Sequence, residues 1–139
     1  MPTTLDENES PLFQEEPISV LIVDHNLSFL GVTKMFLEAN CRQDIDVVLT
    51  ASDGKEAIAQ AQAHHPQLIL LDVSLPGMTG METALQIKKI LPQSHIILLT
   101  LIETLGYQQA AQAAGADTLL DKSNLDTELL PSIQRLLHG

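Results

Sequence analysis

The sequence is poor in several residue types, and each shortage narrows the classes of protein it can encode. Cys41 is the only cysteine, which excludes an internal disulfide and a thiolate metal cluster and favours a buried or half-buried structural thiol over a reactive one. No apolar run approaches the roughly 20 residues that a membrane-spanning helix needs. The N-terminus also lacks the basic start and apolar centre of a secretory signal. We therefore expect a cytoplasmic location and no membrane binding.

Basic residues are scarce as well. Seven Lys and Arg residues stand against 18 Asp and Glu residues, giving a formal net charge of −11. An acidic surface without a basic stripe repels the phosphates of nucleic acids. We therefore expect no direct binding to nucleic acid.

Residues 1–17 differ in composition from the rest of the chain. They hold five acidic residues, three prolines and no Lys or Arg. Such a composition cannot bury enough apolar surface to offset the entropy of ordering, which predicts a disordered acidic tail. The remaining residues, 18–139, have the length of one domain with a single core.

From residue 18 onward, apolar runs alternate with segments of helical period. The runs cover residues 18–23, 45–50, 68–71, 95–101 and 116–120. The segments of helical period cover residues 27–40, 54–64, 80–91, 104–114 and 125–138. Five strands, each followed by a helix, predict an α/β fold. The near-continuous apolar character of the strands predicts a parallel sheet that is covered by helices on both faces.

Local signals agree with these boundaries. Asp53 with Glu56, and Thr79 with Glu82, have the spacing of a capping box at expected helix starts. In the last helix, apolar residues recur on one face, which is most simply explained by packing against the core.

Four polar residues follow the ends of expected strands: Asp24, Asp72, Thr100 and Lys122. Parallel strands of an open α/β sheet present their carboxyl ends at one edge, where such sheets bind ligands. A carboxylate there can act as a nucleophile toward a phosphoryl group. Mg²⁺ bound to carboxylate and carbonyl oxygens, a Lys ammonium and a Thr hydroxyl can neutralise and orient that group. The Pro76-Gly77 turn after Asp72 is expected to bring a carbonyl such as that of Ser74 to the metal.

With these residues in place, the chain resembles the receiver domain of two-component response regulators over roughly residues 18–138. The matching pieces are residues 18–24, the stretch LLDVSLPGMTG within 68–80, residues 96–100 and the stretch AGADTLLDKS at 114–123. No single piece is specific, but their order and spacing together are. The resemblance implies a flavodoxin-like, doubly wound fold with five parallel strands in the order 2-1-3-4-5 and five helices.

The resemblance also implies a role for each site residue. A partner histidine kinase or phosphotransfer protein would phosphorylate Asp72, and the domain would not be an enzyme but a phosphoacceptor that assists its own Mg²⁺-dependent phosphoryl transfer. Asp24, Asp72 and the Ser74 carbonyl would bind the metal. Lys122 would contact the phosphoryl group. Thr100 would move toward it and alter the face formed by the fourth helix, fifth strand and fifth helix, which would bind an output domain or a second copy.

Two positions depart from the family pattern. His25 stands where the family usually has a second acid that touches the metal, and imidazole is a poor ligand for Mg²⁺. We therefore expect weak Mg²⁺ binding; Mn²⁺ or Zn²⁺ is an alternative with His25 as a ligand, and a solvent-facing His25 that binds nothing is another. Leu119 stands where the family often has an aromatic residue that turns inward on activation, so the usual conformational change is in doubt.

Alternatives to a phosphoacceptor remain open. A degenerate receiver would keep the fold and bind a partner without phosphorylation, and His25 and Leu119 favour it. A metal-dependent phosphohydrolase with Asp72 as nucleophile is disfavoured because no residue supplies a general acid for a second step. Ser123, where many receivers have proline, is reminiscent of regulators with a DNA-binding domain, so the chain is either a stand-alone receiver or part of a longer regulator.

Overall fold

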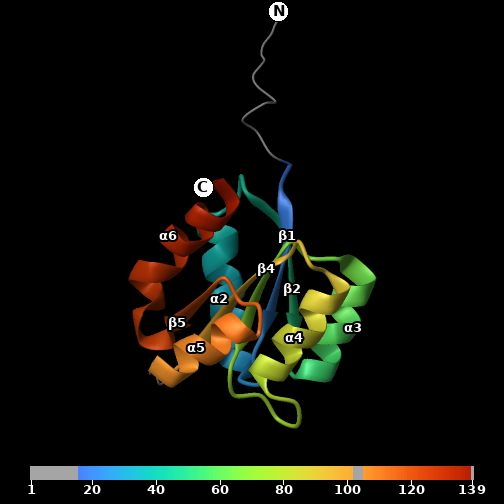
Figure 1. Ribbon diagram of the computed structural model, residues 1–139. Coiled ribbons are helices and arrows are strands. Elements are labelled where there is room, and N and C mark those ends of the chain that lie inside the picture. The colour runs from blue at the N-terminus through green and yellow to red at the C-terminus, as the bar shows by residue number, and fades with distance from the viewer. Residues whose placement is uncertain (1–15, 102–104, 139) are drawn as a thin grey trace, which may run out of the picture.

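The computed structural model describes residues 16–101 and 105–138, which form five β-α units around one sheet (Figure 1). The strands are β1 (Ile18–Val23), β2 (Ile45–Ala51), β3 (Leu68–Asp72), β4 (His95–Thr100) and β5 (Thr118–Asp121). The helices are α2 (Leu27–Asn40), α3 (Gly54–His64), α4 (Gly80–Ile90), α5 (Leu105–Ala113) and α6 (Leu125–His138), with a short 3₁₀ turn, η1 (Lys122–Asn124), before α6. The predicted tail at 1–17 lies almost wholly outside the described residues.

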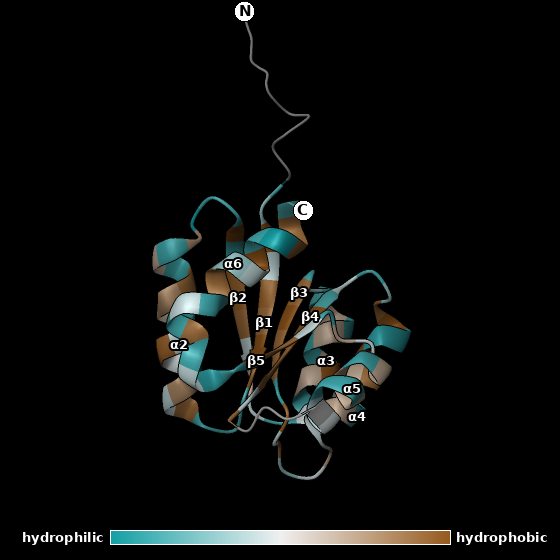
Figure 2. Ribbon diagram, turned by 60° about the vertical axis from the view of Figure 1, so that its left-hand side comes forward, coloured by the Kyte–Doolittle hydropathy of each residue, from teal (hydrophilic) through white to brown (hydrophobic). Residues whose placement is uncertain are grey.

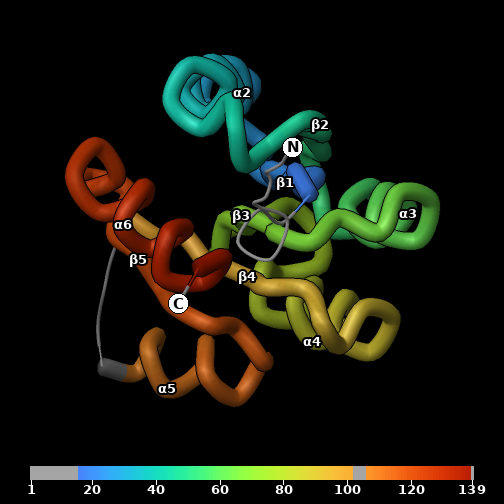
Figure 3. The backbone as a smooth tube through the Cα atoms, turned by 90° about the horizontal axis from the view of Figure 1, so that it is seen from above, coloured from blue at the N-terminus to red at the C-terminus, as the bar shows by residue number. Residues whose placement is uncertain are grey.

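All strand pairs are parallel, in the order β2-β1-β3-β4-β5. The predicted fold class and strand order are therefore confirmed. Seen along the sheet, α2 and α6 cover one face and α3, α4 and α5 cover the other (Figure 3). Among the described residues, no helix combines the length and the hydrophobicity needed to cross a bilayer.

Two apolar layers hold the helices on the sheet. Alternate strand residues such as Leu21, Ile69 and Leu98 pack with small residues of α3, α4 and α5, while their neighbours, such as Ile22 and Leu70, pack with α2 and α6. Figure 2 shows the strands as mostly hydrophobic and the helices as a mixture of hydrophilic and hydrophobic segments. The apolar stripe of the last helix belongs to this core, as predicted.

Two helices start where the sequence predicts a cap. Thr79 and Glu82 form a complete capping box at the start of α4. Asp53 caps α3 by accepting a hydrogen bond from the Glu56 N–H, but the Glu56 carboxylate bonds Ser52 in place of Asp53. Cys41 is buried, and both its burial and nearby Asp44 raise its pKa, in keeping with a structural thiol.

Candidate functional site

Four polar residues lie at the carboxyl edge of the sheet. Asp24 directly follows β1, Asp72 ends β3, Thr100 ends β4 and Lys122 directly follows β5. Asp24, Asp72 and Thr100 are all buried. Because Asp72 pairs in register with Leu99, Thr100 lies one residue beyond the partner of Asp72. The three charged side chains are brought together as the sequence predicts, and the role of Thr100 stays a prediction.

The position of Asp24 is fixed by its own backbone. Its N–H donates to the Ala51 carbonyl at 3.1 Å, continuing the pairing with β2, and its Oδ1 accepts the N–H of Asn26 at 2.8 Å. Asn26 in turn caps α2 by accepting the N–H of Phe29. These bonds hold Asp24 in the short connection between β1 and α2, where 0% of its surface is exposed.

Lys122 joins the two acids. Its Nζ donates a hydrogen bond to Asp24 Oδ2 and lies 3.5 Å from Asp72 Oδ2, and only 12% of its side chain is exposed. The ammonium also lies 4.3 Å from the centre of the Phe29 ring, a cation–π contact. Asp121, the acid that precedes Lys122 in the sequence, accepts hydrogen bonds from the backbone and hydroxyl of Ser123.

Phe29 is the site residue that the sequence does not reveal. It lies at the third position of α2 and looks like any apolar residue of a core-facing helix. The only hint in the sequence is that Phe29 follows closely after Asp24. The first turn of α2 therefore lies at the same edge of the sheet as the strand ends.

The site contains more negative than positive charge. Burial raises the pKa of Asp72, and the Asp24 carboxylate raises it further; Lys122 and the backbone of Ser74 act in the opposite direction but do not cancel the shift. Two buried carboxylates share one ammonium. The arrangement therefore favours a cation bound beside Asp72, which would offset the negative charge of the two carboxylates.

The loop after Asp72 turns sharply. Gly77 has φ +76°, as the predicted Pro76-Gly77 turn requires, and the Gly80 N–H donates to the Val73 carbonyl at 2.9 Å. The chain thus folds back so that α4 begins directly against the end of β3. Ser74 is exposed in this loop, and its carbonyl as a metal ligand stays a prediction.

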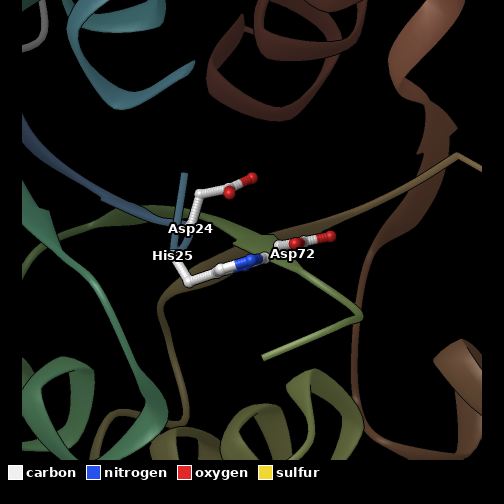
Figure 4. A group of neighbouring side chains, drawn as sticks. All are labelled: Asp24, His25 and Asp72. Atoms are coloured by element: carbon white, nitrogen blue, oxygen red, sulfur yellow. The ribbon is translucent and has the colours of Figure 1, made fainter. Parts of the chain in front are cut away.

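His25 completes a group of possible metal ligands. One ligand atom each from Asp24, His25 and Asp72 lies within 4.8 Å of the others, and Figure 4 shows the imidazole of His25 extending toward the side chain of Asp72. The two carboxylates provide the hard oxygen donors that suit Mg²⁺. The imidazole does not, because Mg²⁺ binds nitrogen poorly. The donor set thus fits a divalent cation, but Mg²⁺ only in part.

Leu119 is buried in the core layer beneath α5. An open hollow of about 300 Å³ lies beside it between α5 and β5, lined also by Gln108, Gln112 and Asp117. The leucine at this position thus borders a space that a larger side chain would fill.

Comparison with known proteins identifies the family. The sequence model described as the response regulator receiver domain matches residues 20–134. The response regulator protein VraR of Staphylococcus aureus is 35% identical over 124 residues, which cover 88% of this chain and 57% of VraR. The chain therefore spans somewhat more than half the length of this relative. It belongs to the family of response regulator receiver domains of two-component systems.

Solved structures agree. A CheY-like receiver domain protein from Methanospirillum hungatei JF-1 matches with a TM-score of 0.78 and 28% identity, over 86% of this chain and 93% of that one. The chemotaxis protein CheY4 of Vibrio cholerae matches with a TM-score of 0.77 and 31% identity, over 87% and 99%. Receiver domains are generally regulatory rather than enzymatic, and they typically bind Mg²⁺.

Proposed function

We propose that this domain accepts a phosphoryl group on Asp72 from a phosphohistidine of a sensor kinase or phosphotransfer protein. The observation that supports this most is the contact of Lys122 with both buried acids. An ammonium held there can pair with phosphoryl oxygens as they arrive.

The transfer exchanges one bond for another. An Asp72 carboxylate oxygen forms a bond to phosphorus while the N–P bond of the donor breaks, and the donor imidazole leaves and takes up a proton from water. Lys122 stabilises the added negative charge, and the Thr100 hydroxyl donates a hydrogen bond to it. A divalent cation held by Asp24, Asp72 and the Ser74 carbonyl would neutralise charge on the transferring group. Mg²⁺ would serve weakly because His25 replaces an oxygen ligand.

The face formed by α5, β5 and α6 is the proposed contact for a partner, either an output domain or a second copy. Thr100 lies in register with Asp121 of β5, so a movement of its side chain toward Asp72 acts on this strand first. We place the domain in the cytoplasm, where a kinase can reach it, without direct contact with nucleic acid.

The test is intact mass after incubation with phosphoramidate and Mg²⁺ or Mn²⁺. We expect the mass to rise by one phosphoryl group, the gain to be lost in Asp72→Asn, and the adduct to be released by hydroxylamine as an acyl phosphate. Asp46→Asn, which changes an exposed aspartate of β2, is the matched control and keeps the gain. Failure of the wild type with both metals would refute phosphorylation and favour a receiver that binds its partner without it.

A further inference from the structure

The imidazole of His25 is available to a metal ion. Its side chain is exposed, and it makes no hydrogen bond or ion pair with any side chain in the described part of the protein. Asp24 and Asp72, in contrast, are buried and held by their neighbours. The group therefore combines two fixed oxygen ligands with one imidazole that can rotate at little cost.

The spacing suits a single ion. Metal–ligand bonds of about 2.0–2.2 Å place neighbouring ligand atoms about 3 Å apart and opposite ones about 4.2–4.4 Å apart. The three ligand atoms already lie within 4.8 Å of one another. Because the His25 side chain is exposed, it is free to turn toward the two carboxylates and shorten these distances. Across residues 16–101 and 105–138, no other three His, Cys, Asp or Glu side chains gather so closely.

The choice of ion follows from the donor atoms. Imidazole suits Zn²⁺, Co²⁺ and, less strongly, Mn²⁺, whereas Mg²⁺ demands oxygen. The Lys122 ammonium beside Asp24 opposes any cation, so the ion that gains most from a nitrogen ligand has the advantage. We infer that Asp24, His25 and Asp72 bind a divalent transition-metal ion in preference to Mg²⁺, with His25 as a direct ligand. The inference rests on the proposed function only in placing the cation beside Asp72.

Calorimetric titration of the free protein with Co²⁺ and with Mg²⁺, without any phosphodonor, tests the inference. We expect Co²⁺ to bind at least about tenfold more tightly than Mg²⁺, and His25→Ala to lose at least about tenfold in Co²⁺ affinity. His25→Asp should bind Mg²⁺ about tenfold more tightly than the wild type, because it restores an oxygen ligand. His64→Ala, which removes an exposed histidine at the end of α3, should change neither affinity.

A second readout locates the ion directly. Bound Co²⁺ should shift the ring proton resonances of His25 strongly and those of His64 little. The inference would be overturned if the wild type bound the two metals equally well, or if His25→Ala bound Co²⁺ as tightly as the wild type. It would also be overturned if His64→Ala lost as much Co²⁺ affinity as His25→Ala. The titration needs no phosphodonor, so its result is independent of the mass experiment under the proposed function. If Co²⁺ binds through His25 but phosphoramidate adds no phosphoryl group, only the proposed function is refuted. If Asp72 is phosphorylated but Co²⁺ binds equally well with and without His25, only this inference is refuted.

Discussion

Gly80 offers a direct test of how closely α4 approaches the end of β3, where Asp72 lies. A Cβ at this position would lie 2.1 Å from the Asp72 carbonyl oxygen and 2.7 Å from the Val73 Cα. Both atoms belong to the backbone at the end of β3, so neither can move without moving the strand end. Gly80→Ala should therefore push the first turn of α4 away from Asp72.

The expected loss of stability can be estimated from these contacts. Overpacking that forces a backbone shift typically costs about 1–3 kcal/mol, and the two contacts here place Gly80→Ala at the upper end of that range. Gly80 is the first residue of α4, where the gain in helix propensity is smaller than the about 0.5–1 kcal/mol of an interior position, so a net loss of at least about 2 kcal/mol remains. Urea unfolding followed by circular dichroism measures it as a lower midpoint.

Gly31→Ala is the matched control. Gly31 lies on α2, and a Cβ there would meet no atom within 4 Å, so only the gain in helix propensity remains. We expect its unfolding midpoint to rise. A midpoint of Gly80→Ala at or above that of the wild type would show that α4 does not begin against the backbone of Asp72, and the geometry of the site would need revision.

Three further substitutions test the charges of the site and the N-cap of α4. Burial and the Asp24 carboxylate raise the pKa of Asp72, so folding favours the protonated form of this carboxyl group. The protonated form therefore contributes to stability at low pH, and this contribution is lost as the pH rises above about 4. Asp72→Asn should therefore melt higher than the wild type at pH 7, with the difference shrinking toward pH 4; a constant difference would contradict the assigned cause. Lys122→Met leaves the two acids without their shared cation and should lose about 1–3 kcal/mol at pH 7 in urea unfolding, part of which Asp72→Asn restores in the double variant. Thr79→Ala removes the hydroxyl that accepts the Glu82 N–H and should cost about 1 kcal/mol, whereas an unchanged midpoint would deny the cap any role.

The sequence predicts the fold well because its strands are short, apolar and separated by helices with clear periods. All five predicted strands and helices are present, with bounds that agree within two residues where the structure describes them. The largest difference is at β5, which begins at Thr118 rather than at residue 116. Gly115 takes φ +89° and Asp117 turns its carboxylate to the N–H of Ile96, so these residues still belong to the turn.

The 3₁₀ turn at Lys122–Asn124 is not predicted, because three residues are too few to show a period. Its cause is local: the Asp121 carboxylate accepts the N–H of Ser123. This turn matters for the site, since it directs Lys122 back over Phe29 and toward Asp24, a residue 98 positions earlier in the chain. Strand order alone brings the two residues to one edge of the sheet, but the pairing of their side chains depends on this turn.

The two departures from the family pattern affect the protein in different ways because the fold constrains them differently. Leu119 is buried in the core layer under α5, so its size sets how β5 and α5 pack. His25 is exposed, while the Asp24 backbone hydrogen bond to Ala51 and the Asn26 cap already fix the chain on either side of it. We therefore expect an acid or an imidazole at position 25 to leave the fold unchanged and to affect only the binding of a cation beside Asp72. Substitution at His25 should change metal affinity without changing stability in the absence of metal, whereas substitution at Leu119 should change stability as well.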